Sequence, residues 1–472
     1  MVSSRASRPT TPKAVRVVSP PRLSQSDLRA AGRGLRDTCP RESHAAWKPS
    51  PDRPDPLALL HASNKGRVAD LIPIRYGRMV RSPFTFYRGA ALNMAHDLGQ
   101  TPVTGMRVQA CGDCHLMNFG SFGTPERRLI FDINDLDETL PAPWEWDVKR
   151  LAASFVLACR NNGFAKGDAS DAALACARSY RQRMAEYSEM SVLDVWYSSI
   201  DTEKVIEKAR DPATRKRFQK RVAAARARSV LEHDFPKLAA MAGREPRIKD
   251  SPPLIYHPRS ETEESLLAGA RYAFAGYRDS LPEDRRRLID RYEVKDLAMK
   301  VVGVGSVGTV CTVMLLMATD TDPLFLQLKE ARQSVLEPYA GKSLHANHGQ
   351  RIVNGYRLVQ SASDLFLGWT RGKTGRHYFV RQLRDMKLSP LVELFTPSLM
   401  LEYAALCGWT LARAHARSGE PAQISGYLGK SDVFDKAIAR FAVAYADQDE
   451  RDHEVLRQAV QSGQVDVVVE PE

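Results

Sequence analysis

The chain has 472 residues, of which 43% are hydrophobic and 26% charged, and its formal net charge is +12. This length exceeds the usual limit of one hydrophobic core, so we expect two or three packed units. The positive charge favours anionic partners such as nucleotides, phosphorylated metabolites, nucleic acid or a membrane surface, without choosing among them. The seven cysteines argue against a disulfide framework, because their number is odd and the chain is large. No apolar run approaches a bilayer-spanning length and none follows the basic N-terminus as in a secretory signal, so we expect a cytoplasmic protein.

The first half of the chain predicts a leader followed by a helical region. Residues 1–56 are rich in Ser, Arg and Pro and have few large apolar residues, which predicts a disordered basic leader. Residues 57–290 are mostly helical in pattern, for example over 84–98. Short strands are expected within this region at 108–110 and 128–133.

In the second half of the chain the sequence pattern changes from helical to strand-like. Residues 291–395 contain a β-branched apolar run at 309–318, a polar turn and a strand-like segment at 324–329, which together predict an antiparallel β-meander. A helix at 348–363 and a strand at 378–383 are expected to follow.

Residues 396–472 are helical again, notably over 399–416 and 432–461, and we expect them to pack on the earlier helical region. The predicted fold class is therefore α+β, with a large helical portion and a small antiparallel sheet.

The first motif is the run Cys-Gly-Asp-Cys-His-Leu-Met-Asn at 111–118, followed by acidic positions whose spacing is distinctive. Asp113 and Asn118 are five positions apart, and Asp135 and Asp147 are twelve apart. These segments resemble the catalytic segment of the aminoglycoside phosphotransferase and choline kinase branch of the protein-kinase-like superfamily. That branch has a Gly-Asp-x-His-x-x-Asn loop, then a strand that ends in Asp, then an Asp that opens the next helix.

The resemblance implies a phosphotransfer site that uses ATP and Mg²⁺. Phosphoryl transfer needs a carboxylate at the acceptor hydroxyl and oxygen ligands for the magnesium that bridges the phosphates. Asp113 would be the base or orienting group, and His115 would brace the loop. The metal ligands would be Asn118 and Asp135, with Asp137 nearby.

Two further acidic residues need a role. Asp132 is a competing metal ligand, because the strand could end there instead of at Asp135. Asp147 would be structural, capping the helix that it opens and tying the acidic loop.

The same residues fit other patterns. Cys111, Cys114 and His115 match the Cys-x-x-Cys-His pattern of covalent haem attachment, which needs an exported chain. The cysteine pair also fits half of a zinc site, although no second ligand pair completes it, or a redox pair without the usual βαβ surroundings.

The second motif is the glycine segment at 303–308, with Gly303, Gly305, Ser306 and Gly308. A dinucleotide site would need a helix directly after the glycines, whereas the residues that follow are strand formers. The pattern is therefore typical of the kinase glycine loop, whose backbone amides cover the ATP phosphates. Lys329 ends the third strand of the meander, where a kinase places the lysine that pairs with the α- and β-phosphates.

A kinase also holds this lysine with a glutamate of the next helix. The helix expected at 348–363 contains no Glu, so the chain departs from that pattern, and Glu330 or Glu337 is the candidate substitute.

The order of the two motifs is reversed relative to ordinary kinases, because Asp113 precedes Gly303. A circularly permuted kinase-like two-lobed fold accounts for this order, since permutation is tolerated where native termini lie close together at the surface. The helix at 407–416 resembles the Leu-Ala-x-x-His helix that precedes the kinase catalytic loop, although its periodicity alone predicts a core helix with His415 as a packing residue, and we favour that interpretation. The hypothesis requires the acidic loop and the glycine segment to meet across one cleft.

From about residue 75 to 463 the chain also resembles a bacterial domain-of-unknown-function family, DUF2252. The resemblance rests on the segments 82–89, 111–120, 131–138, 381–387 and 426–435. It implies no function by itself.

Several basic groups remain. An arginine series before the acidic loop could meet phosphates or an acidic substrate, or could be a solvated face: Arg75, Arg78, Arg81 and Arg88. Three residues after the meander could line the nucleotide cleft: Arg381, Arg384 and Lys387. The Arg-rich run 215–228 could bind nucleic acid, but one Phe gives little support for base stacking.

Three functions follow from these motifs. The first is a phosphotransferase acting on a small hydroxylated molecule, with transfer of AMP as a variant. The second is a nucleotide-binding regulatory protein, like a pseudokinase, and the third is a nucleic-acid-binding protein. Neither the acceptor nor the oligomeric state follows from the sequence.

Overall fold

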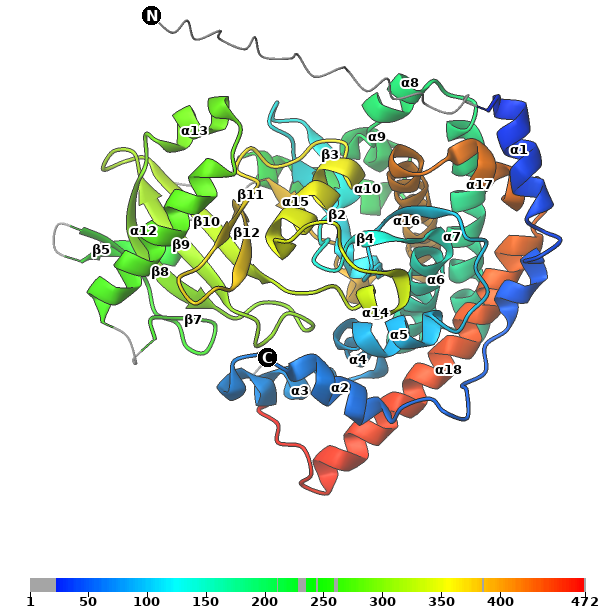
Figure 1. Cartoon of the computed structure of the whole chain (residues 1–472), viewed down its shortest axis with the longest axis horizontal. Coiled ribbons are helices and arrows are strands. Elements are labelled where there is room, and N and C mark those ends of the chain that lie inside the picture. The colour runs from blue at the N-terminus through cyan, green and yellow to red at the C-terminus, as the bar shows by residue number, and fades with distance from the viewer. Residues whose placement is uncertain are drawn as a thin grey trace, which may run out of the picture.

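The computed structural model describes residues 23–209, 211–227, 235–242, 245–258, 262–383 and 386–470. Figure 1 shows a sheet part on one side and a helical part on the other. The prediction of an α+β protein with small antiparallel sheets and a large helical portion is confirmed. No helix in these ranges is long and apolar enough to cross a membrane.

The helical part is built around four long helices that pack on one another: α6 (Trp144–Asn161), α7 (Lys166–Tyr187), α16 (Pro397–Ser418) and α18 (Val433–Gln461). Small residues let their backbones approach closely. A Cβ on Gly408 of α16 would meet the backbone oxygen of Cys176 in α7. Aromatic packing adds to the contact, since Trp144 stacks on Tyr180 with ring centroids 5.6 Å apart.

Shorter helices and two small sheets surround this bundle. The helices are α2 (Pro56–Asn64), α3 (Ile72–Met79), α4 (Pro83–Gly89), α5 (Ala91–Leu98), α8 (Val192–Tyr197), α9 (Thr202–Glu207), α10 (Pro212–Arg226) and α17 (Pro421–Leu428). The strands are β1 (Arg107–Ala110), β2 (Phe119–Gly123), β3 (Leu129–Ile133), β4 (Leu140–Pro143) and β13 (Lys387–Leu388), in the pairings β1-β4 and β13-β2-β3. The helix expected over 84–98 is interrupted at Ala90, where the backbone leaves the helical region.

The sheet part contains the predicted meander. Its six antiparallel strands follow the order β11-β12-β10-β9-β8-β7. Their bounds are β7 (Ile255–Tyr256), β8 (Glu293–Lys300), β9 (Cys311–Met317), β10 (Pro323–Ala331), β11 (Gly368–Arg371) and β12 (His377–Gln382). A separate hairpin comprises β5 (Ala239–Ala242) and β6 (Glu245–Ile248), after the short α11 (Phe235–Leu238).

Alternation along β10 separates the two faces of this sheet. Leu324, Leu326 and Leu328 lie in one apolar cluster with Tyr277 of α12 (Glu263–Asp279), while Lys329 faces the other way. The same cluster includes Ile289 of α13 (Glu283–Ile289). Both helices therefore pack on the sheet, although the predicted boundary at residue 290 assigned them to the helical region. Helix α15 (His348–Val359) packs on β10 and β12, and the short α14 (Glu337–Ala340) follows β10.

The predicted disordered leader is wrong for residues 23–56, and residues 1–22 lie outside the described ranges. Helix α1 (Gln25–Gly34) packs on α17, where Gly426 makes close contact with the backbone of Arg29. The basic residues that suggested a solvated tail bind the end of α17. Arg36 donates to the carbonyl oxygens of Gly426 (2.6 Å) and Tyr427 (2.8 Å), and Arg41 donates to that of Leu428 (2.8 Å). These carbonyls have no partner within the helix, so the arginines act as its C-terminal cap.

Candidate active site between the acidic loop and the glycine segment

The acidic loop is held by a single carboxylate. It leaves β1 at Cys111 and turns at Gly112, whose φ of 84° is a conformation that favours glycine. The two carboxylate oxygens of Asp147 accept hydrogen bonds from the backbone amides of Cys111 (2.6 Å) and Gly112 (3.1 Å). His415 Nε2 lies 3.2 Å from the same carboxylate, so α16 also braces the loop. Asp147 thus ties the loop, but it does not cap α6, whose N-cap residue is Pro143.

Asp113 projects from this loop toward a buried cation that sequence reasoning missed. Arg150, one helical turn after Asp147, donates from Nε to Asp113 Oδ1 (2.7 Å) and makes a second bond from its terminal nitrogen. The signal that could have identified Arg150 is its place in a nearly fully buried helix, because a buried arginine needs an anionic partner.

The other two loop residues lie beside Asp113. Asn118 donates through its side-chain amide to the Asp113 carbonyl (2.7 Å), and His115 Nε2 is 3.9 Å from the Asp113 carboxylate. Burial lowers the pKa of His115 to about 4, so its ring is neutral at pH 7.

The acidic segment and the third strand of the meander meet. Lys329 Nζ lies 2.6 Å from Asp137 Oδ2 and 3.4 Å from Asp135 Oδ2, across 194 positions of sequence in the second case. Burial would raise the pKa of Asp135, but the charges of Lys329 and Arg381 outweigh it and hold that pKa below its ordinary value. Burial and the charge of Asp135 raise the pKa of Asp137 to about 7. The second oxygen, Oδ1, of each carboxylate is buried and has no hydrogen-bond partner among the described residues.

Asp132 lies away from this group. Its side chain is fully buried in an ion pair with Arg413 of α16, at 2.6 Å, and it accepts hydrogen bonds from the backbone and hydroxyl of Ser361. Of the two competing candidates for a metal ligand, Asp135 therefore lines the cavity and Asp132 belongs to the core.

The predicted glutamate partner of Lys329 is wrong for both candidates. Glu330 pairs with Arg376 (2.6 Å), and Glu337 accepts a hydrogen bond from the Ser334 amide. Helix α15 presents Arg351 instead, which donates to the carbonyl of Asp137 (2.9 Å) and so supports the acidic segment from behind.

The glycine segment joins β8 to β9 and is pinned from outside the sheet. The amide of Val68 donates to the carbonyl of Gly308 (2.7 Å), and Arg67 donates to that of Val307 (2.6 Å). Gly303 and Gly308 have φ values of 66° and 86°, which favour glycine at both positions.

One cavity of about 610 Å³ joins these elements, within the usual size range of small-molecule sites. It is lined by most of the predicted site residues: Asp113, His115, Asn118, Asp135, Asp137, Gly303, Gly305 and Ser306. Lys329 is only 3% exposed and reaches the cavity through its ion pairs, whereas Gly308 does not line it.

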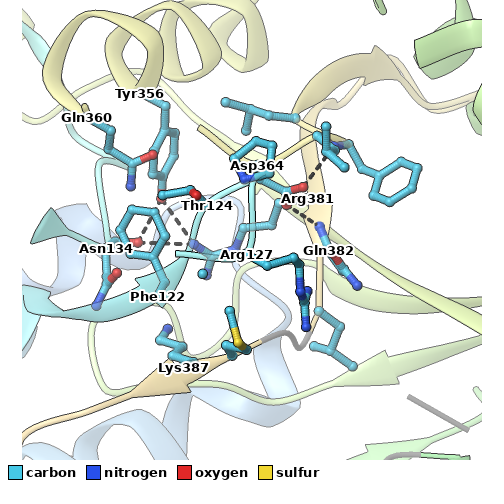
Figure 2. Close-up of a pocket in the computed structure, with 17 residues that line it drawn as sticks. Phe122, Thr124, Arg127, Asn134, Tyr356, Gln360, Asp364, Arg381, Gln382 and Lys387 are labelled. Carbon is cyan, nitrogen blue, oxygen red and sulfur yellow. Dashed lines mark hydrogen bonds between the residues drawn. The ribbon is translucent and has the colours of Figure 1, made fainter. Parts of the chain in front are cut away.

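A second cavity, of about 300 Å³, adjoins the other side of this acidic segment. Asn134 lines it, directly before Asp135. Figure 2 shows Arg381 and Tyr356 converging on Asn134, with both donating to its carbonyl (3.1 and 3.0 Å). Lys387 also lines this cavity, and burial together with the charge of Arg381 lowers its pKa to about 8. Of the three basic residues predicted near the nucleotide, two therefore lie here, and Arg384 lies outside the described residues.

The cysteine pair lies beneath the loop. One sulfur each of Cys111 and Cys114 and one oxygen of Asp147 lie within 4.8 Å of one another and are buried. Burial raises the pKa of the Cys114 thiol to about 12, and that of Cys111 rises as well. Metal ligation would need thiolates, and the Asp147 oxygens already accept backbone hydrogen bonds, so we assign no metal to this cluster.

Arginines of α10 are used within the chain. Arg221 donates to the carbonyl of Ser389 (2.7 Å), and Arg226 pairs with Glu203 (2.9 Å). These contacts give no support to a free basic surface for nucleic acid.

The fold and this site define an α+β protein in which a cavity separates a sheet carrying a buried lysine from a helical part carrying an acidic loop. The sequence profile of the family described as "Uncharacterized protein conserved in bacteria (DUF2252)" matches residues 67–459, and the chain belongs to that family. Comparisons with curated proteins and with solved structures gave no match.

Proposed function

We propose that the protein is an ATP- and Mg²⁺-dependent phosphotransferase with a circularly permuted kinase-like fold, acting on a small hydroxylated acceptor. The observation that carries this proposal is the meeting of Lys329 with Asp135 and Asp137 beside Asp113 in one cavity. These residues come from two motifs that were assigned to the same chemistry independently of each other. Their meeting in one cavity is what the hypothesis requires, and it supports the proposal.

The carboxylates suit a magnesium ion. Mg²⁺ prefers oxygen ligands, and the Oδ1 atoms of Asp135 and Asp137 are buried with no hydrogen-bond partner among the described residues. Orphaned buried acceptors are costly, and a cation would satisfy them. We assign Asp135, Asp137 and Asn118 as the residues that would hold the ion. When bound, Mg²⁺ would neutralise the negative charge of the nucleotide phosphates.

The remaining residues position the reactants. The glycine segment, with Gly303 and Gly305 in the cavity wall, offers backbone close to the expected phosphates. Lys329 contributes a positive charge on the third strand. Asp113 would orient the acceptor hydroxyl through Oδ2, since Arg150 occupies Oδ1.

The ion pair between Asp113 and Arg150 also favours a second function. Arg150 occupies Oδ1 of Asp113 and leaves one carboxylate oxygen for an acceptor, so a nucleotide-binding regulatory protein with little turnover has the same geometry. Measurement of turnover separates the two functions.

The test compares the wild type with Asp113→Asn. Binding of a non-hydrolysable ATP analogue with Mg²⁺ is measured by calorimetry, and ATP consumption is measured with the small-molecule fraction of a bacterial extract as the source of acceptor. We expect analogue affinity to stay within about threefold while turnover falls by about 10²–10⁴. Binding without turnover in the wild type would favour the regulatory function, and absence of analogue binding would contradict both.

A further inference from the structure

The cavity has a basic wall in addition to its acidic one. We use "basic wall" for its five cationic residues, which come from α2 to α4 and from the residues after β10: Lys65, Arg67, Arg75, Arg88 and Arg332. Two of the four arginines that preceded the acidic loop in sequence are among them. The other two, Arg78 and Arg81, bind Glu470 near the C-terminus instead.

The four arginines of the basic wall differ from the acids that share the cavity. Asp113, Asp135, Asp137 and Glu330 each have a cationic partner, whereas Glu138 accepts a hydrogen bond from the backbone amide of Val335. None of the four arginines forms an ion pair with a carboxylate in the described ranges. Their hydrogen bonds go to neutral groups, such as the carbonyls of Ser63 and Val307 for Arg67 and that of Gly89 for Arg75.

Two of these arginines have buried donors without a partner. Arg75 is 1% exposed, and its Nε has no hydrogen-bond partner among the described residues. The Nε of Arg88 is also buried and unpartnered, and we find no hydrogen bond from the rest of its guanidinium to the described residues. A charged group held in or near the interior without an ion-pair partner is costly, so this wall favours the binding of an anion.

Repulsion among the arginines of the basic wall also favours the binding of an anion there. Burial, together with the charges of Arg75 and Arg332, lowers the pKa of Arg67 to about 8. Burial lowers the pKa of Arg75 to about 10 as well. An anion placed among these groups would relieve both effects.

The position of Arg88 indicates which reactant carries the anion. Arg88 lines the same cavity as Asp113, the residue assigned to the acceptor, and the charge of Asp113 opposes the lowering of the Arg88 pKa by burial. The backbone oxygen of Arg88 lies 2.9 Å from where a Cβ of Gly305 would be. Arg88 therefore reaches from the glycine segment to the acceptor side of the cavity.

We propose that the acceptor is itself an anion, carrying a phosphate or carboxylate group that Arg88 binds beside the buried charge of Arg75, while its hydroxyl faces Asp113. This proposal rests on the proposed phosphotransferase function. Guanidinium groups suit both anions, because they donate paired hydrogen bonds to two oxygens. Arg67, Arg332 and Lys65 supply the surrounding positive field.

The experiment uses inorganic phosphate as the probe of the acceptor-side anion. Its affinity for the full chain is measured by calorimetry at constant ionic strength, with and without a saturating Mg²⁺ complex of a non-hydrolysable ATP analogue. We expect phosphate to bind in both conditions. Arg88→Gln should weaken phosphate by about tenfold or more and change analogue affinity by less than about threefold, because a hydrogen bond to a charged group is lost only from the acceptor side.

A melting measurement on Arg88→Gln and two further variants, Lys65→Gln and Arg440→Gln, control for misfolding and for general charge effects. In phosphate-free buffer, Arg88→Gln should melt no lower than the wild type, because it removes a half-buried charge without removing a hydrogen bond to the described residues. Lys65→Gln, at an exposed position, should weaken phosphate by a smaller factor. Arg440→Gln, on an exposed position of α18, is the matched control and should change nothing.

The failures of the two proposals are distinguishable. If the analogue displaces phosphate, the basic wall serves the nucleotide and the anionic acceptor is refuted. If Arg88→Gln binds phosphate as the wild type does, the assignment of Arg88 is refuted. If phosphate binds in an Arg88-dependent manner but the analogue does not bind, the anion site stands and the phosphotransferase function falls.

Discussion

Replacement of Lys329 by methionine is the sharpest perturbation of the site. Lys329 is 3% exposed, and its Nζ lies 2.6 Å from Asp137 and 3.4 Å from Asp135. Methionine keeps most of the apolar stem and removes the charge. Two carboxylates then face each other in the cavity with their nearest cation gone.

The expected cost follows from the loss of one partner of a buried ion pair. Such losses destabilise proteins by about 3–5 kcal/mol. For Lys329→Met we expect a loss of unfolding free energy at the lower end of this range, about 3 kcal/mol near pH 8, because Asp137 can take up a proton.

The cost should depend on pH with a defined sign. Without Lys329 the pKa values of both carboxyl groups rise in the folded protein, so the unfolded chain loses its protons first. The unfolding free energy of the variant therefore falls as pH increases from about 4, and the difference from wild type is smallest in acid.

Magnesium should restore part of the loss. The ion binds the folded acid pair and stabilises it by about 1.4 kcal/mol at ten times its dissociation constant. The gain should be larger in Lys329→Met than in the wild type, because Lys329 no longer competes for the same oxygens.

The assay is urea denaturation at several pH values, with MgCl₂ or with NaCl of equal ionic strength. The matched control is Lys295→Met, since Lys295 also lies on the sheet but pairs with exposed carboxylates, where ion pairs contribute little. Equal stabilisation by Mg²⁺ in Lys329→Met and wild type, or an unfolding free energy unchanged by the mutation, would refute the reasoning.

Three other changes test separate parts of the site. In the wild type, the raised pKa of Asp137 means that the unfolding free energy falls as pH rises from about 4 to about 7. Asp137→Asn should therefore flatten the plot of unfolding free energy against pH in that window, and an unchanged slope of this plot would count against the assignment. Asp147→Asn should lower the unfolding free energy by about 1–3 kcal/mol and reduce ATP turnover, because an amide nitrogen would face the loop amides of Cys111 and Gly112. Normal turnover would show that the loop does not need the hydrogen bonds from these amides to Asp147. Gly112→Ala should destabilise by about 1–3 kcal/mol in thermal melting, since φ is 84° and a Cβ would meet the carbonyl of Glu138, whereas Gly167→Ala has open space and should be neutral.

Local patterns predicted much of the sheet part. The apolar run of β9, the polar turn and the strand-like pattern of β10 identified the meander, whereas β8 was not predicted as a strand; Lys329 lies on the third strand. The spacing of Asp113, Asn118 and Asp135 predicted residues that line one cavity. These features succeed because periodicity and turn chemistry act over a few residues.

Contacts between distant segments were beyond such reasoning. The leader looked solvated because its arginines are basic, but Arg36 and Arg41 cap a helix almost 400 positions away. Lys329 was expected to pair with a glutamate nearby in sequence, and the two aspartates of the acidic segment take that place. Arg150 and Arg351 were missed for the same reason, because only tertiary packing defines the partner of a buried cation.

The most direct test of the central claim is a crystal structure of the chain with Mg²⁺ and a non-hydrolysable ATP analogue. We predict a metal peak about 2.1 Å from oxygens of Asp135 and its neighbours, with the triphosphate between Lys329 and the glycine segment. A nucleotide seated in the second cavity beside Arg381, or anywhere away from Asp135, would contradict the account.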